Sequence, residues 1–159
     1  MVKIEVLLRK GIVGRIGETE LERYISFFRE SCEDNARHAE ANMASYPRWS
    51  IISGYYAMHD ATKLFLSKSF RIKIDFEVHS TTIKVLKELI DNKEILNLIE
   101  RGYKEFLSLA NDLAEAKKNR VKMQYYTGTK FMKEEYSKKA EEFHNAIVLV
   151  YLEKIRRLL

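Results

Sequence analysis

The stretch of sequence that decides the fold is residues 48 to 67, RWSIISGYYAMHDATKLFLS. Its apolar residues spread round most of a helical wheel: Trp49, Ile51, Ile52, Tyr55, Tyr56, Ala57, Met58, Ala61, Leu64, Phe65 and Leu66. A helix that is apolar on several faces is usually central and buried. Pro47 stands just before the stretch and suits the first turn of a helix. The stretch therefore predicts a central helix over about Arg48 to Ser67, with other helices packed around it.

The preceding helix is predicted from about Leu21 to Ala44. Steps of three and four residues make one apolar stripe of Leu21, Ile25, Phe28, Cys32, Ala36, Ala39 and Met43. Thr19 is expected to cap this helix, with Glu22 three residues later completing a capping box. The chain before it, residues 1 to 18, is expected to form an extension with a short helix from Lys3 to Lys10. A strand is the alternative there, because residues 4 to 8, IEVLL, also suit β structure.

Residues 69 to 78, SFRIKIDFEV, break the helical pattern. They alternate over a few positions, so they could form a short strand. A loop is expected instead, because no partner strand is obvious. Ser80 or Thr81 is expected to cap a third helix that ends near Ile90, with Ile83 and Leu86 facing inward.

Two more helices complete the prediction. After a turn at Asp91 and Asn92, the fourth helix carries an inward stripe of Ile95, Ile99, Tyr103, Phe106, Ala110 and Leu113. Gly102 within it predicts a close approach of a neighbouring helix. The last helix, about Met132 to Leu158, carries Tyr136, Ala140, Phe143, Ile147, Val150 and Ile155 on one side. Five main helices with short links predict an all-α, antiparallel up-and-down bundle that spans residues 19 to 159 as a single domain.

Composition agrees with one helical domain and excludes several classes of protein. Of the 159 residues, 46% are hydrophobic, which is enough for a sizeable core, while one proline and six glycines argue against an all-β fold. Cys32 is the single cysteine, so an intrachain disulfide is impossible, and neither a metal site nor a cofactor is expected. No apolar run approaches a membrane span and no convincing signal peptide begins the chain, so a cytoplasmic protein is expected.

A basic and aromatic segment, residues 117 to 128, KKNRVKMQYYTG, is the first candidate site. Lys117, Arg120 and Lys122 could contact phosphates, and Tyr125 and Tyr126 could stack on bases. The net charge of +5 permits an anionic partner. The alternative is a solvated, cation-rich helix end, favoured by the helix dipole, with a tyrosine against the core.

Other polar residues form two further candidate sites. His59 and Asp60 interrupt the central helix, so they lie either on its one solvated stripe or in a polar pocket. Arg71 and His79 flank the segment after that helix and would converge if the segment doubles back. The alternative is a solvated Arg71 and a local hydrogen bond for His79. Off the main stripe of the last helix lie three apolar residues that suit either a dimer interface or a large core: Val148, Tyr151 and Leu152.

Residues 53 to 89, SGYYAMHDATKLFLSKSFRIKIDFEVHSTTIKVLKEL, resemble the signature of HEPN domains (higher eukaryote and prokaryote nucleotide-binding), of the small stand-alone type of archaea and bacteria. The family's helix pattern is matched by Tyr55, Tyr56, Ala57 and Ala61, its aromatic–arginine pair by Phe70 and Arg71, and its histidine by His79. KKNRVKMQYY resembles the basic end of the family's fourth helix. The resemblance covers roughly residues 20 to 158.

This resemblance implies a helical bundle that often forms a homodimer. Many members are ribonucleases, often toxins paired with a small nucleotidyltransferase antitoxin, and their active sites carry Arg-x(4–6)-His near the dimer interface. The strict motif is absent here, because Arg71 precedes His79 by eight positions (79 − 71) and Arg120 is followed by Tyr125 and Tyr126. Tyrosine, with a reference pKa near 10, is a poor general base at neutral pH.

The prediction is therefore a non-catalytic or weakly catalytic HEPN-type domain. It would bind RNA or a nucleotide-linked partner, within a toxin–antitoxin-like pair and alongside a nucleotidyltransferase-like protein. One alternative is a metal-independent endoribonuclease that uses Arg71 and His79. A second alternative is a protein-interaction module with no role in nucleic-acid binding.

Overall fold

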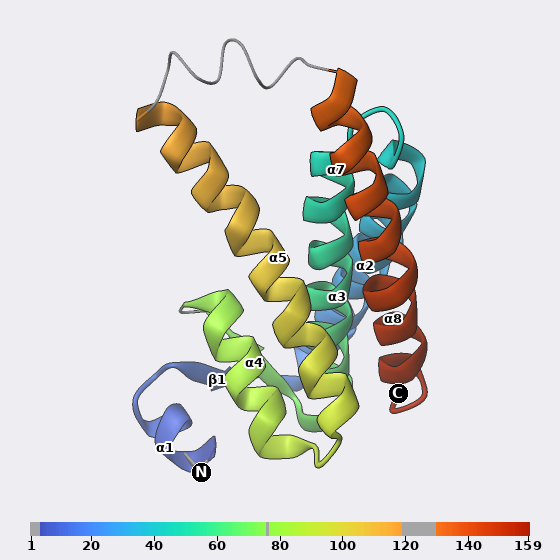
Figure 1. Ribbon diagram of the computed structural model, residues 1–159. Coiled ribbons are helices and arrows are strands. Elements are labelled where there is room, and N and C mark those ends of the chain that lie inside the picture. The colour runs from blue at the N-terminus through green and yellow to red at the C-terminus, as the bar shows by residue number, and fades with distance from the viewer. Residues whose placement is uncertain (1–3, 76, 119–129) are drawn as a thin grey trace.

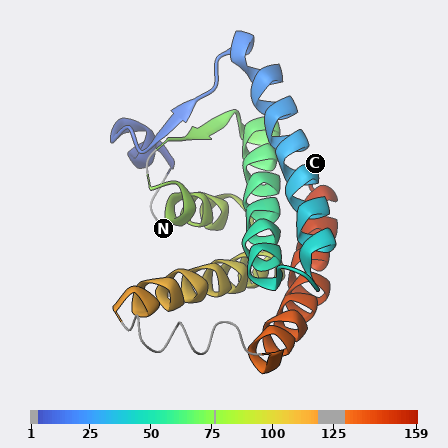
Figure 2. The same cartoon turned by 90° about the horizontal axis from the view of Figure 1, so that it is seen from above.

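The computed structural model describes residues 4–75, 77–118 and 130–159, with side chains for 4–75, 77–109 and 134–159. The chain forms an all-α bundle with one small strand pair (Figures 1 and 2). Its elements are, in order, α1 (Ile4–Arg9), β1 (Val13–Arg15), α2 (Glu18–Asn42), α3 (Pro47–Phe70), β2 (Ile72–Ile74), α4 (Val78–Leu89), α5 (Lys93–Lys118), α7 (Lys130–Phe143), the π-helix η1 (His144–Val148) and α8 (Leu149–Arg156).

The central position predicted for α3 is confirmed. Figure 2 shows α2 and α8 on one side of this helix and α4 with the strand pair on the other. Tyr55 and Ala57, which lie nearly opposite each other round α3, are both fully buried, and Leu64, on the same side as Ala57, is buried too. Pro47 occupies the first turn of the helix, as predicted. Because α3 supplies core residues on several faces, every other layer of the molecule packs against it.

The pairing of α2 with α3 is the most extensive in the molecule. The predicted stripe of α2 is buried at Ile25, Phe28, Cys32 and Ala39. The predicted capping box is wrong, because the helix begins at Glu18 and Gly17 is its N-cap, without a side-chain hydrogen bond. Thr19 therefore lies within the first turn.

The expected loop at residues 69 to 78 contains a strand. β2 pairs in antiparallel fashion with β1, with Val13 opposite Ile74 and Arg15 opposite Ile72. The prediction failed because the partner strand comes from the N-terminal segment, far away along the chain. Val13, Ile72 and Ile74 are buried, while Arg15 is exposed, so the N-terminal segment contributes Val13 to the same core as the helices.

Two helix starts also differ from the prediction. α4 begins after Glu77, whose backbone is left-handed (φ 41°), so neither Ser80 nor Thr81 is its N-cap. Ser80 Oγ instead donates back to the Glu77 carbonyl at 3.2 Å. α5 is capped by Asn92, whose Oδ1 accepts the Ile95 amide at 3.1 Å.

The close helix approach predicted at Gly102 is confirmed. A Cβ atom there would lie 3.0 Å from both Cε and Sδ of Met58, so the α5 backbone packs directly on α3. Figure 1 shows α5 crossing α3 at an angle, with its C-terminal end away from α7.

The predicted last helix is interrupted by a π-helical turn at His144–Val148. The residues off the main stripe, Val148 at the end of this turn and Tyr151 and Leu152 beyond it, are buried within this chain. The Tyr151 hydroxyl forms a 2.5 Å hydrogen bond with Thr62 Oγ1 of α3. These three residues therefore belong to a large core, and they are not available to a dimer interface.

Candidate functional site

A buried polar cluster occupies the middle of α3. His59 and Asp60 are only 4% and 7% exposed. From α2, Ser31 Oγ donates to Asp60 Oδ2 at 2.7 Å, and Asn35 Nδ2 donates to the same oxygen at 3.0 Å. Asp60 Oδ1 lies 3.8 Å from His59 Nδ1. A buried carboxylate needs such partners, so Asp60 is held by polar groups of α2, and neither His59 nor Asp60 lies on a solvated stripe.

His79, near the start of α4, closes this cluster from the other side. The hydroxyl of the fully buried Tyr55 and His79 Nδ1 form a 2.9 Å hydrogen bond. The His79 ring lies 4.7 Å from the His59 ring and 5.5 Å from the Phe106 ring, centroid to centroid. The pKa of His79 is lowered to about 4, mainly by burial and also by His59 and Lys63, while the Asp60 carboxylate acts in the opposite direction. His79 is therefore neutral at pH 7.

Two histidine nitrogens in the core lack a hydrogen-bond partner among the described residues. They are Nε2 of His59 and Nδ1 of His144. Burial also lowers the pKa of His144, which keeps that ring neutral. A neutral imidazole tolerates an unpaired nitrogen better than a charged one does. The His144 ring therefore packs in the core in its neutral form.

Arg71 does not join His79 within this chain. It ends α3 in the left-handed conformation (φ 53°), and its exposed guanidinium donates to both carboxylate oxygens of Glu18. Twelve residues (71 − 59) separate it from His59 on one helix, which places the two about 18 Å apart along the axis. His79 packs at His59, so the geometry matches the alternative of a surface Arg71 and a locally bonded His79.

The basic and aromatic segment falls largely outside the described residues. Arg120, Lys122, Tyr125 and Tyr126 all lie in residues 119–129. Lys117 belongs to the last turns of α5, where the backbone is described and the side chain is not. Their role in binding stays a prediction.

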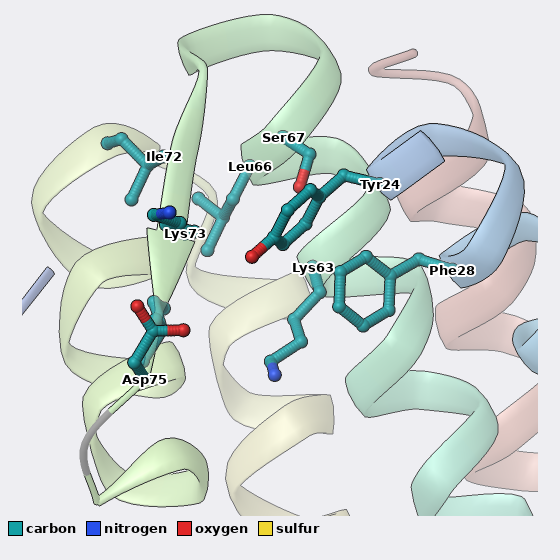
Figure 3. Close-up of a pocket in the computed structure, with 9 residues that line it drawn as sticks. Tyr24, Phe28, Lys63, Leu66, Ser67, Ile72, Lys73 and Asp75 are labelled. Carbon is teal, nitrogen blue, oxygen red and sulfur yellow. The ribbon is translucent and has the colours of Figure 1, made fainter. Parts of the chain in front are cut away.

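A small pocket that the sequence analysis missed lies between α2, α3 and β2 (Figure 3). Its volume is about 180 Å³. Its lining residues are Tyr24, Phe28, Lys63, Leu66, Ser67, Ile72, Lys73, Ile74 and Asp75. Helical spacing was the one hint of this pocket in the sequence. Tyr24 and Phe28 are four residues apart on α2, and Lys63 and Ser67 are four residues apart on α3. This spacing does not predict a pocket by itself, because the third wall is formed by β2.

The pocket combines two cations with two aromatic rings. Lys63 Nζ lies 5.0 Å from the centre of the Phe28 ring, and Lys73 Nζ lies 5.9 Å from that of Tyr24. Lys73 also lies 3.6 Å from a carboxylate oxygen of Glu20. Burial lowers the pKa of Lys63, while Asp60 and Asp75 act in the opposite direction. The pocket therefore offers Lys73, which is paired with a carboxylate, and Lys63, which has no carboxylate within ion-pair distance in the described part of the chain.

Comparison with known proteins does not assign a function to these sites. No protein-family model, curated protein or solved structure matches the chain. Within residues 4–75, 77–109 and 134–159, no group of three or more His, Cys, Asp or Glu side chains could hold a metal ion. No helix in the same ranges is long and apolar enough to cross a membrane.

The neutral state of His79 predicts a loss of stability in acid. Its pKa is about 4 in the folded chain against about 6.5 in the unfolded chain. Between these values the unfolded chain holds the proton and the folded chain does not. The free energy of unfolding should therefore fall as pH drops from about 6.5 to 4, by about 3 kcal/mol at most. Thermal unfolding at pH 7 and pH 4.5 measures this loss.

The variant His79→Gln separates His79 from the other titrating groups. It should unfold with a smaller difference between the two pH values than the unmodified chain does. His144, whose pKa is also lowered, contributes equally to both chains. An unchanged difference in the variant would show that His79 is not the source.

Proposed function

We propose that this chain is a HEPN-type helical domain that binds RNA or a nucleotide-linked partner and is non-catalytic or weakly catalytic. The observation that carries the proposal is the contact between two separate parts of the HEPN-like pattern. The Tyr55 hydroxyl meets His79 Nδ1 at 2.9 Å, and the rings of Tyr56 and His79 are 5.7 Å apart. Tyr55 and Tyr56, which resemble the family's helix, thus pack against His79, which resembles the family's histidine. This contact supports the interpretation that the three residues belong to one family pattern.

The state of the histidines supports binding without efficient catalysis. A general base works best with a pKa near the working pH and within reach of its substrate. His79 has a pKa of about 4 and its Nδ1 is engaged with Tyr55. His59 and His144 are buried, and Arg71 is paired with Glu18.

The binding surface in this proposal is the basic and aromatic segment. Lys117, Arg120 and Lys122 attract phosphates, and Tyr125 or Tyr126 stacks on a base. By the family resemblance, a homodimer and a nucleotidyltransferase-like protein are the proposed protein partners, as in a toxin–antitoxin-like pair.

Binding of a short single-stranded RNA at two salt concentrations tests the proposal. The affinity should fall as salt rises, and a variant with Lys117, Arg120 and Lys122 all changed to Gln should lose affinity. Its slope of log affinity against log salt should be shallower by about 2, because each phosphate contact on a single strand contributes roughly 0.7.

A matched control changes three exposed lysines elsewhere, Lys84, Lys104 and Lys138, to Gln, which removes the same net charge. This control should bind RNA nearly as well as the unmodified chain. Absence of binding at low salt, or equal losses in the two triple variants, would refute the proposed surface.

Incubation of the RNA with the protein in EDTA addresses the alternatives. The proposal expects little or no cleavage. Efficient cleavage that disappears in His79→Ala would instead establish the metal-independent endoribonuclease. A stable complex with a partner protein that survives the triple substitution, without RNA binding, would establish the interaction module.

A further inference from the structure

Lys63 is a cation that is partly removed from water. It is half-buried on α3, and among the described residues no carboxylate oxygen lies within ion-pair distance of its Nζ. Its Nζ lies 5.0 Å from the centre of the Phe28 ring, and the charges of Asp60 and Asp75 act on it from beyond ion-pair distance. Removing an ammonium from water without an anionic partner costs free energy, and an anion brought to it from solution would offset that cost.

The groups around Lys63 face one common space. Figure 3 shows the Lys63 ammonium, the Tyr24 hydroxyl and the Asp75 carboxylate directed toward the same opening, with the Phe28 ring beside Lys63. Phe28 is buried and Tyr24 half-buried, so α2 offers two ring surfaces at one wall. The arrangement combines a cation and a hydroxyl donor for an oxyanion with aromatic surfaces for a flat apolar body.

Size and charge narrow the class of ligand. The pocket, at about 180 Å³, is smaller than the range of roughly 300–1,000 Å³ that is usual for drug-sized ligands. Lys73 is already paired with Glu20, and Asp75 is exposed at the opening. Among the described residues no carboxylate lies within ion-pair distance of Lys63, so its cation is left for a ligand, and the Asp75 carboxylate repels a second anionic group. A ligand with a single anionic group fits better than a polyanion.

We propose that this pocket binds a small molecule that carries one carboxylate or phosphate group on a flat, largely apolar body. Lys63 and the Tyr24 hydroxyl hold the oxyanion, and Phe28 packs against the body. This site is separate from the basic segment proposed for RNA, so either proposal can fail without the other.

Calorimetric titration of the full chain with four probes tests the pocket. The probes are phenyl phosphate, benzoate, inorganic phosphate and the neutral benzyl alcohol. At least one of the two aromatic anions should bind with one site per chain and more tightly than benzyl alcohol and inorganic phosphate. Preference for phenyl phosphate would assign a phosphate ester as the natural group and preference for benzoate a carboxylate, and both results support the site.

Substitutions of single residues then test whether Lys63 binds the aromatic anion. Lys63→Met keeps the apolar stem and should weaken the aromatic anion by roughly tenfold or more, the effect of losing one charge-assisted contact. Lys104→Met, a matched change at an exposed lysine of α5, should leave the affinity unchanged. Asp75→Asn should strengthen binding, because it removes the repelling carboxylate.

Clear results would overturn this proposal. They are absence of binding by both aromatic anions at millimolar concentration, equal binding of benzyl alcohol, or equal losses in Lys63→Met and Lys104→Met. If Lys63→Met does not fold, amide chemical shifts of the unmodified chain decide. Shifts induced by the bound probe should centre on Tyr24, Phe28 and Lys63, and shifts centred elsewhere would refute the site.

Discussion

Replacing Tyr55 by alanine is expected to lower the free energy of unfolding by about 3–5 kcal/mol, the usual cost of removing a large aromatic side chain from a core. Tyr55 is fully buried in the middle of α3. Its ring stacks on Phe106 and Tyr103 of α5, with centroids 4.7 and 5.8 Å away, and its hydroxyl bonds His79 of α4. The alanine variant therefore loses contacts with two helices at once. Chemical denaturation followed by circular dichroism measures the loss.

Two further tyrosine variants separate the causes. Tyr55→Phe keeps the ring and should cost about 1 kcal/mol, the typical net value of one hydrogen bond. Tyr46→Ala removes a tyrosine that is 62% exposed and should change stability by less than about 0.5 kcal/mol. If Tyr55→Ala were no more destabilising than Tyr46→Ala, the central role of Tyr55 would be wrong.

Gly54→Val is the second substitution expected to have a large effect, with a loss of about 2–3 kcal/mol from overpacking. A Cβ atom at Gly54 would lie 2.9 Å from Val148 Cγ2 and 3.2 Å from Phe143 Cε1. Val148 is buried in the π-helical turn and is stiff about its first side-chain torsion. It cannot move aside without shifting the backbone of the last helix. Thermal unfolding should show a clear drop in the midpoint.

Gly17→Val is the matched control for this substitution. Gly17 lies at the start of α2 with an extended backbone (φ −68°), and a Cβ there meets only Glu20 Oε2, at 3.8 Å. Valine should therefore be accommodated at position 17 at a much smaller cost. Equal midpoints for the two variants would contradict the close contact between α3 and the π-helical turn.

Much of the fold follows from local patterns in the sequence. The apolar circumference of α3 predicted its central place, because such a surface has to be covered on several sides. Gly102 predicted a close helix approach because a missing Cβ is useful where two backbones meet. Both inferences depend on residues of one helix, and the structure confirms both.

The features that were missed depend on residues far apart in the chain. The local sequence predicts a loop over Ile72–Ile74, because the partner strand, Val13–Arg15, precedes two long helices. The same error hid the pocket, since its third wall belongs to β2. Burial of Asp60 could not be decided from α3 by itself, because its hydrogen-bond donors, Ser31 and Asn35, belong to α2. Periodicity says which face of a helix is apolar, and it says little about which polar groups meet across an interface.

The pairing of β1 with β2 has a consequence for the order in which the chain can fold during synthesis. The paired residues Val13 and Ile74 are 61 positions apart (74 − 13). At translation rates of about 5–20 residues per second, β2 is made roughly 3–12 s after β1. Helices form within microseconds, so α2 and α3 can be complete while the first strand still waits for its partner. The strand pair can therefore be added to α2 and α3 before the helices that follow β2 have been synthesised.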